Sequence, residues 1–119
     1  MRPYLVTISV PVPLYRSFDY LAPDALVETL RPGQRVRVPF GRQHLVGVVL
    51  RPPQELNGEV ADYRPIDELI DAEPLLHPEL LGLCEWAATY YQHPLGDVLA
   101  GALPGGFKQG APASADIPQ

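Results

Sequence analysis

Residues 35–42 alternate apolar and polar side chains and end in a Pro-Phe-Gly-Arg corner. The even positions are apolar up to the corner, whereas Arg35 and Arg37 occupy odd positions. A period of two is typical of a β-strand with one buried face, and a glycine after it favours a tight turn. The stretch therefore predicts a strand with Arg35 and Arg37 on its open face, leading through Gly41 and Arg42 into a hairpin.

The same period of two recurs upstream, where every even position from residue 4 to residue 14 is apolar. A Pro-Gly pair in residues 30–34 predicts a turn. Short strands separated by such corners, within fewer than about 70 residues, favour a small barrel of the OB or SH3-like kind. Besides residues 4–14 and 35–40, the further strands are predicted over residues 17–21, 45–51 and 63–69.

After these strands the sequence changes to a helical pattern. Apolar residues recur at steps of three and four over residues 78–91, and Pro78 occupies the first turn, where a helix tolerates proline. His93-Pro94 ends this helix, and a shorter one is predicted up to residue 103. We expect Trp86, Tyr90 and Tyr91 to pack the helices onto the barrel.

The fold class predicted from these patterns is α+β, with a small OB/SH3-like β-barrel followed by a short helical subdomain and a flexible linker. The last segment contains mainly Gly, Pro, Ala and Ser, which have little to bury. The predicted boundaries are 1–73 for the barrel, 74–104 for the helices packed on it, and 105–119 for the linker or tail.

Charge is distributed unevenly along the chain. The first 54 residues hold seven arginines against three carboxylates, whereas the remainder holds two cations against eleven carboxylates, for a net charge of −5. A polyanion would therefore meet the N-terminal half. Eight of the nine cations are arginine, which suits forked contacts to phosphate. The alternative is that the charge division merely follows a strand-rich half and a helix-rich half.

Several classes of protein receive no support from the sequence. The single cysteine, Cys84, cannot form an intramolecular disulfide and fits a reducing compartment. No apolar run reaches the roughly 20 residues that span a bilayer, and no signal-peptide pattern opens the chain. The three histidines lack metal-ligand spacing, and no phosphate-binding glycine loop is present. We expect a cytoplasmic domain without catalytic residues, metal, cofactor or membrane contact.

Residues 18–20, Phe-Asp-Tyr, carry the chemistry needed to hold the end of a nucleic-acid strand. An aromatic ring stacks a base, and Gly41 allows close backbone approach. An ionised Asp19 accepts a hydrogen bond from a free 3′-hydroxyl but repels a 3′-phosphate. The alternatives are that Phe18 and Tyr20 are core residues, with Tyr20 behind the pocket, and that Asp19 is a surface carboxylate.

The chain resembles the family of N-terminal domains of PriA, the bacterial replication-restart helicases also called primosomal protein N′. Four segments carry this resemblance, and they occur in the same order along the sequence as in that family. Together the segments cover most of residues 4–104, so the resemblance extends over nearly the whole predicted domain. They are residues 10–14 (VPVPL), 17–21 (SFDYL), 35–43 (RVRVPFGRQ) and 86–99 (WAATYYQHPLGDVL).

The resemblance implies a module that binds the 3′ end of single-stranded or forked DNA, namely the nascent leading-strand end at a stalled fork. It implies that ATP-dependent 3′-to-5′ helicase domains lie further along the full-length chain. It also implies that the protein acts in the bacterial cytoplasm, at the nucleoid. Carried over by position, the 3′-end pocket comprises Phe18, Asp19, Tyr20, Gly41 and Arg64, the last in place of a lysine. From the strand pattern we expect phosphate contacts from Arg35, Arg37 and Arg42.

A different class of function stays open from the sequence alone. The barrel could be a protein-interaction or RNA-binding module without end specificity, with its arginines as charges at the rim of an interface. Steep salt dependence of oligonucleotide binding, together with a requirement for a free 3′ end, would separate the two.

Overall fold

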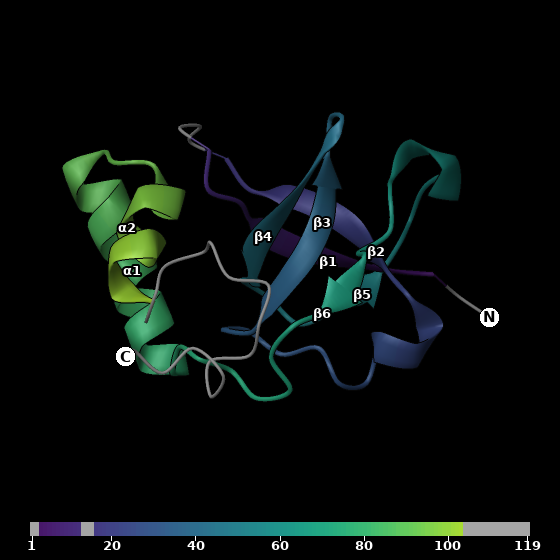
Figure 1. The fold of residues 1–119 in the computed structure, drawn as a ribbon, viewed down its shortest axis with the longest axis horizontal. Helices are drawn as coiled ribbons and strands as arrows, with labels where there is room; N and C mark the ends of the chain where they lie inside the picture. Colours follow the sequence, from purple (N-terminus) through teal and green to yellow (C-terminus); the bar gives the residue numbers. More distant parts are fainter. Residues whose placement is uncertain (1–2, 13–15, 104–119) are drawn as a thin grey trace.

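The computed structural model describes residues 3–12 and 16–103. A curled, antiparallel sheet forms one part of the molecule, and two helices lie together beside it (Figure 1). The sheet has six strands in the order β2-β1-β4-β3-β6, with β5 paired to β1. This α+β arrangement, a barrel-like sheet followed by helices, confirms the predicted fold class; the predicted linker lies outside the described residues.

The strands are short, as the frequent corners in the sequence predicted. The first strand ends at Ser9, five residues before the predicted end, because the chain bends at residues 11–12, where Pro11 has no N–H for a ladder. The strands are β1 (Tyr4–Ser9), β2 (Phe18–Ala22), β3 (Arg35–Phe40), β4 (Gln43–Val49), β5 (Gln54–Glu55) and β6 (Glu68–Leu69).

Strands β3 and β4 form the predicted hairpin, in which Arg35 lies opposite Val48 and Phe40 opposite Gln43. Gly41 has a φ of +62° at the first position of the two-residue turn, as in a type II′ turn. Gly33, in the turn before β3, has a φ of +97°. A glycine therefore fixes the backbone just before and just after β3.

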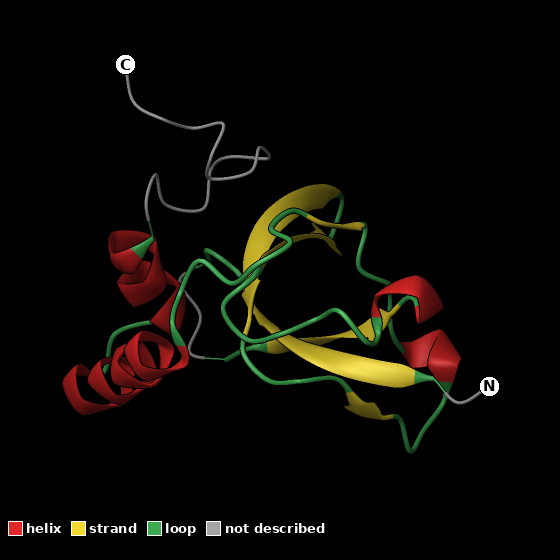
Figure 2. Cartoon of the chain, turned by 90° about the horizontal axis from the view of Figure 1, so that it is seen from below, coloured by secondary structure: helices red, strands yellow, loops and turns green. Residues whose placement is uncertain are grey.

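Two apolar clusters stabilise the molecule, one on each side of the sheet. Val6, Ile8, Val36 and Val38 belong to the cluster enclosed by the curled sheet. The second cluster joins residues of β4 to residues of both helices, and Figure 2 shows these helices beside the sheet. Its buried members are Val46, Val48, Leu50, Ile70, Leu76, Leu81, Cys84, Leu99 and Leu103. The predicted barrel and the predicted helical subdomain both contribute residues to this second cluster, so the two share a core. The domain boundary at residue 73 therefore stays a prediction.

Helix α1 (Pro78–Tyr91) has the predicted bounds, and α2 (Leu95–Ala102) follows it after a short connection. Helix α1 ends where Gln92 adopts a left-handed conformation with a φ of 57°. Within the described residues, neither helix is long and apolar enough to cross a membrane.

The expectation that Trp86, Tyr90 and Tyr91 pack the helices onto the barrel is wrong. Their exposed fractions are 56%, 65% and 62%, and the rings of Trp86 and Tyr90 stack on each other with centroids 4.9 Å apart. Helix α1 buries Leu81, Cys84 and Ala88 instead. Only one stripe of residues at steps of three and four can face the sheet, and the large aromatic side chains lie outside it.

Candidate nucleic-acid interface

Arg35, predicted on the open face of its strand, is fully buried in an ion pair. Its Nε and Nη2 donate to the two carboxylate oxygens of Asp71 at 2.9 and 3.1 Å, and its main-chain N–H donates to the same carboxylate at 3.0 Å. Both side chains are at most 3% exposed. The segment after β6 covers this end of the strand, since the N–H of Ile70 donates to the Arg35 carbonyl. The predicted phosphate contact of Arg35 is therefore wrong.

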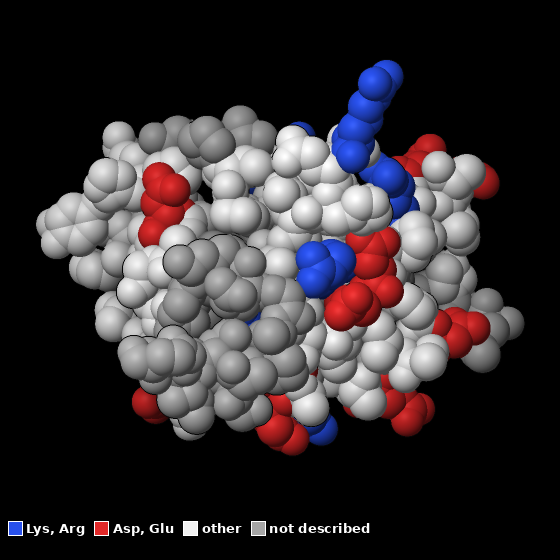
Figure 3. Space-filling model, viewed as in Figure 1, with Lys and Arg blue, Asp and Glu red and all other residues white. Residues whose placement is uncertain are grey.

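The other two predicted phosphate contacts lie nearer the β3–β4 turn. Arg37 is half-buried, and its Nε lies 3.7 Å from Oε1 of Glu68. Arg42 is exposed in the turn itself. Figure 3 shows positively charged side chains at the end of the molecule where this turn lies, with acidic side chains beside them.

Gly41 and Arg64 lie together at this turn. The Nη1 of Arg64 donates to the Gly41 carbonyl at 2.9 Å, although the residues are 23 positions apart. Residues 64–66 reach this position because they run alongside β2, where the N–H of Leu21 donates to the Arg64 carbonyl at 2.9 Å. A Cβ added at Gly41 would meet nothing within 4 Å, so the turn opens to solvent.

Phe18 lies in the same neighbourhood. Its ring is half-buried and meets the ring of Phe40 edge to face, with centroids 5.1 Å apart. The guanidinium carbon of Arg16 lies 4.6 Å from the centroid of Phe18, a cation–π arrangement. Because Phe40 precedes Gly41 directly, a continuous surface runs from Arg16 over Phe18 to the turn.

Tyr20 lies beneath this surface, which agrees with the alternative prediction that Tyr20 lies behind the pocket. The ring is buried, and its hydroxyl donates to the carbonyl of Pro39 at 2.8 Å, two residues before Gly41. Burial raises the pKa of this hydroxyl, an effect that the positive charge of Arg64 opposes and the carboxylate of Asp67 adds to. Tyr20 thus anchors the strand that carries the turn.

The Asp19 side chain points to the other face of β2, so the structure does not bring its carboxylate together with Gly41 and Arg64. Successive side chains of a strand alternate, and Phe18 and Tyr20 take the inner face. Asp19 is exposed, and the hydroxyl of Thr7, directly opposite on β1, donates to its Oδ1 at 2.9 Å.

The main chain of Asp19 lies at an open edge. In an antiparallel pair, main-chain groups point alternately toward the partner strand and away from it. Those of Leu21 point away from β1, because they bond to Arg64 and Ile66, so those of Asp19, two residues earlier, point the same way. Within the part of the chain that the structure describes, no residue bonds to the Asp19 N–H or C=O at that edge.

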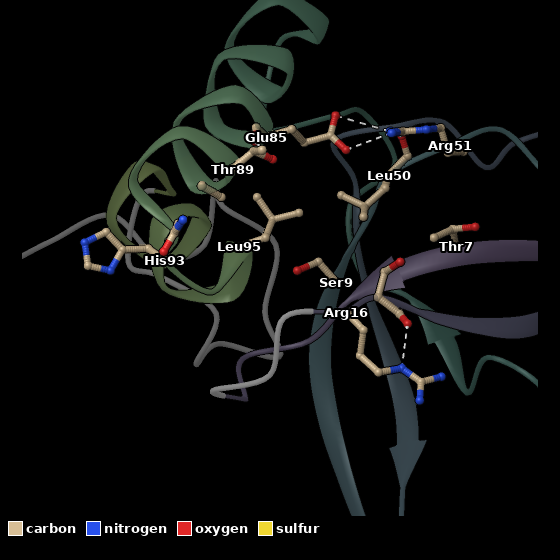
Figure 4. Close-up of a pocket in the computed structure, with 12 residues that line it drawn as sticks. Thr7, Ser9, Arg16, Leu50, Arg51, Glu85, Thr89, His93 and Leu95 are labelled. Carbon is tan, nitrogen blue, oxygen red and sulfur yellow. Dashed lines mark hydrogen bonds and ion pairs between the residues drawn. The ribbon is translucent and has the colours of Figure 1, made fainter.

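On the Asp19 side, a cleft of about 790 Å³ separates the sheet from α1 (Figure 4). Arg51 and Glu85 pair across one end of it, with Nη2–Oε2 at 2.9 Å and Nη1–Oε1 at 3.2 Å. A pocket of about 150 Å³ beside Asp19 shares Thr7 and Arg51 with the cleft. The residues lining the cleft are Thr7, Ser9, Arg16, Ser17, Leu50, Arg51, Glu85, Ala88, Thr89, Gln92, His93 and Leu95.

Sequence reasoning missed Arg16 and the hydrogen bond between His44 and Asp67. Arg16 precedes Phe18 by two residues, so the period of two could have placed it on the same side. His44 Nδ1 lies 2.6 Å from Oδ2 of Asp67, a contact across 23 residues for which the sequence holds no signal. Among the described residues, no group of three His, Cys, Asp or Glu side chains could hold a metal ion.

Comparison with known proteins gives one consistent family. Residues 7–104 match the PriA family model described as the 3′DNA-binding domain, 3′BD. A replication restart protein PriA from Haemophilus influenzae is 39% identical over 109 residues, which is 92% of this chain and 15% of that protein.

Two further proteins with the same name agree with that match. The one from Treponema pallidum is 33% identical over 108 residues, covering 87% of this chain and 16% of the relative. The one from Bacillus subtilis is 36% identical over 73 residues, covering 60% of this chain and 9% of the relative. The chain therefore spans only a small part of the length of its relatives.

Proposed function

The chain belongs to the family of PriA 3′-DNA-binding domains, and from this premise we propose that it binds the 3′ end of a single DNA strand at the edge of β2. The observation that carries the proposal is the position of Arg64, which lies against the Gly41 turn and beside the strand whose main-chain edge is open at Asp19. A terminal nucleotide at this edge would meet cations, an aromatic ring and main-chain groups that bond to none of the described residues.

The main chain of Asp19 supplies one donor and one acceptor to the terminal nucleotide. Every base edge carries donors or acceptors, so main-chain contacts of this kind hold a base without requiring one sequence. The open space at Gly41 supports a second close approach of backbone to ligand, because glycine has no Cβ. Recognition of an end, whatever its base, is the behaviour that follows.

Arg64 and Arg42 bind the phosphate that joins the last two nucleotides. Arg64 uses Nη1 for the Gly41 carbonyl, which orients the guanidinium and leaves its other N–H groups for phosphate oxygens. Arg42 is exposed in the same turn. Phe18 and the guanidinium plane of Arg16 provide the stacking surface for a base.

The Asp19 carboxylate selects a 3′-hydroxyl over a 3′-phosphate. Thr7 holds Oδ1, and Oδ2 keeps its lone pairs for a hydroxyl that reaches round the strand edge. A phosphate at the same place would be repelled, by about 1 kcal/mol for unit charges 4 Å apart in bulk water, because Asp19 is exposed to solvent. Asp19 therefore acts from the outer face of β2, while the cations act from the turn.

In a longer protein of the kind its relatives represent, this domain would engage the nascent leading-strand end at a stalled fork. Its relatives are named replication restart proteins, and this chain covers 15% of the Haemophilus influenzae protein. We propose that the remainder of such a protein supplies an ATP-dependent 3′-to-5′ helicase, to which the bound end is presented.

The test is fluorescence anisotropy of a 5′-labelled single strand that ends in a 3′-hydroxyl, compared with the same strand ending in a 3′-phosphate. The wild-type chain should bind the hydroxyl end about tenfold tighter, a difference of about 1.4 kcal/mol. Asp19→Asn should remove most of this preference, because the amide keeps the size of the side chain but removes its charge.

Glu28→Gln is the matched control, since Glu28 is an exposed carboxylate outside the sheet. It changes the net charge as Asp19→Asn does and should retain the preference. Equal binding of both ends by the wild-type chain would refute end recognition and favour a module without end specificity.

A further inference from the structure

The cleft between the sheet and α1 has the size and chemistry of a binding site. Its volume of about 790 Å³ lies within the range of about 300–1,000 Å³ common for ligand sites. Leu50, Leu95 and Ala88 provide apolar lining, while Thr7, Ser9, Ser17 and Thr89 provide hydroxyl groups. The cleft is distinct from the Gly41–Arg64 turn, none of whose residues line it.

Ser9 contributes a buried hydroxyl group to the lining of the cleft. The residue is 3% exposed, and within residues 3–12 and 16–103 its hydroxyl has no hydrogen-bond partner. Such a hydroxyl keeps both its donor and its acceptor capacity for a ligand in the cleft. Figure 4 shows the Ser9 hydroxyl pointing toward the helix side of the cleft.

Arginines lie at both ends of the cleft. Arg16 lines one end and also covers the ring of Phe18, so its guanidinium joins the cleft to the surface that leads to the turn. Arg51 lies at the other end, where Glu85 neutralises part of its charge. A strand that leaves the end site over Arg16 would enter the cleft directly.

We propose that this cleft holds the nucleotides that immediately precede the 3′-terminal one. Arg16 binds the phosphate at the entrance, a base occupies the space between Leu50 and Leu95, and Ser9 bonds to the edge of that base. The ligand class is a short single-stranded DNA segment rather than a single nucleotide. This inference rests on the proposed end-binding function and extends its footprint across β1 to α1.

The test is a titration of the chain with unlabelled mono-, di- and trinucleotides of thymidine that carry a 3′-hydroxyl. Affinity should rise about tenfold from the mononucleotide to the trinucleotide, because each added base stacks and each added phosphate meets an arginine. Thr89→Trp fills the cleft from an exposed position on α1 and should abolish this gain while leaving mononucleotide affinity unchanged.

Gly82→Trp is the matched control, because it adds the same indole to α1 where an added Cβ meets nothing within 4 Å. It should keep the gain with length. An unchanged gain in Thr89→Trp, or no gain in the wild-type chain, would overturn the proposal.

Glu85→Gln gives an independent test that does not depend on added bulk. Removing the carboxylate releases Arg51 for phosphate, so trinucleotide affinity should increase about threefold and mononucleotide affinity should stay the same. Weaker trinucleotide binding in this variant would count against the cleft. A 3′-phosphorylated trinucleotide separates the two proposals. If it binds the wild-type chain as well as the hydroxyl form does, end recognition fails. If it also loses affinity in Thr89→Trp, the cleft still binds DNA.

Discussion

An arginine lies at each end of β3, and the two arginines have opposite roles. At its first residue, Arg35 is buried and held by both oxygens of Asp71. Beyond its last residue, the guanidinium of Arg64 is exposed and, among the described residues, has the Gly41 carbonyl as its one hydrogen-bond partner. The first guanidinium is committed to the fold, whereas the second keeps donors for a ligand.

The difference shows that burial, not residue type, decides which arginines keep donors for a ligand. A carboxylate partner inside the protein matches a guanidinium in charge and geometry, so nothing remains for a phosphate. A carbonyl partner at the surface orients the guanidinium without neutralising it. The comparison predicts that changes at the first end alter stability and that changes at the second end alter binding.

The largest effect is expected from Asp71→Ala, which leaves Arg35 buried without its carboxylate. Removing one member of a buried ion pair typically costs about 3–5 kcal/mol. Unfolding in urea should show this loss in the free energy of unfolding. DNA affinity, measured under conditions where the variant is still folded, should stay close to that of the wild-type chain.

The double variant Arg35→Met/Asp71→Leu is the control, because apolar residues of similar volume leave no buried charge unpaired. It should recover most of the stability lost in Asp71→Ala. A double variant that is no more stable than Asp71→Ala would mean that Asp71 acts chiefly through its hydrogen bond from the Arg35 main chain.

The two glycines that flank β3 sharpen the comparison. An alanine Cβ at Gly33 would lie 2.2 Å from the carbonyl oxygen of Leu76, in addition to the strain of a φ of +97°. Gly33→Ala should therefore cost about 3 kcal/mol of unfolding free energy, near the upper end for single substitutions. At Gly41 an added Cβ meets nothing within 4 Å, so Gly41→Ala should cost about 1–2 kcal/mol from its positive φ alone.

Thermal and urea unfolding of the two alanine variants measure this difference. DNA binding should show the reverse order, because the added methyl group at Gly41 faces the proposed ligand while that at Gly33 faces the core. Equal losses of stability would show that backbone strain, rather than the contact with Leu76, dominates at both positions.

The sequence predicted the elements better than their contacts. Helix α1 has the predicted bounds because its repeat, its Pro78 and its Pro94 are local signals. The burial of Arg35 depends on Asp71, 36 residues away, and no local pattern reports that contact. The alternation over residues 18–20 implied that Asp19 and Phe18 face opposite sides, but which side faces the Gly41 turn depends on how the sheet curls.

Arg64→Gln tests the exposed end. Loss of one guanidinium at a phosphate should weaken DNA binding about tenfold and reduce the salt dependence by about one counterion, with unfolding free energy changed by less than about 0.5 kcal/mol. Arg31→Gln is the matched control, since Arg31 is an exposed arginine at the buried end of β3. Similar losses of affinity in both variants would mean that net charge, not position, governs binding.

The smallest effect is expected from Tyr20→Phe. This residue belongs to both sides of the comparison, because its hydroxyl is buried and yet supports the exposed Gly41 turn. Loss of the hydrogen bond to Pro39 should cost about 1 kcal/mol of unfolding free energy at neutral pH. Burial raises the pKa of Tyr20 above its ordinary value, so the folded state keeps this proton longer than the unfolded state does.

The contribution of this proton to stability is present below the ordinary tyrosine pKa of about 10 and is lost as the pH rises through the higher folded value. Urea unfolding at about pH 8 and about pH 11 should therefore show the advantage of the wild-type chain over Tyr20→Phe shrinking at the higher pH. An advantage that stays constant would mean that the hydroxyl titrates alike in both states. Such a result would place the Tyr20 ring in contact with water, and the turn would then lack the buried anchor that keeps Gly41 beside Arg64.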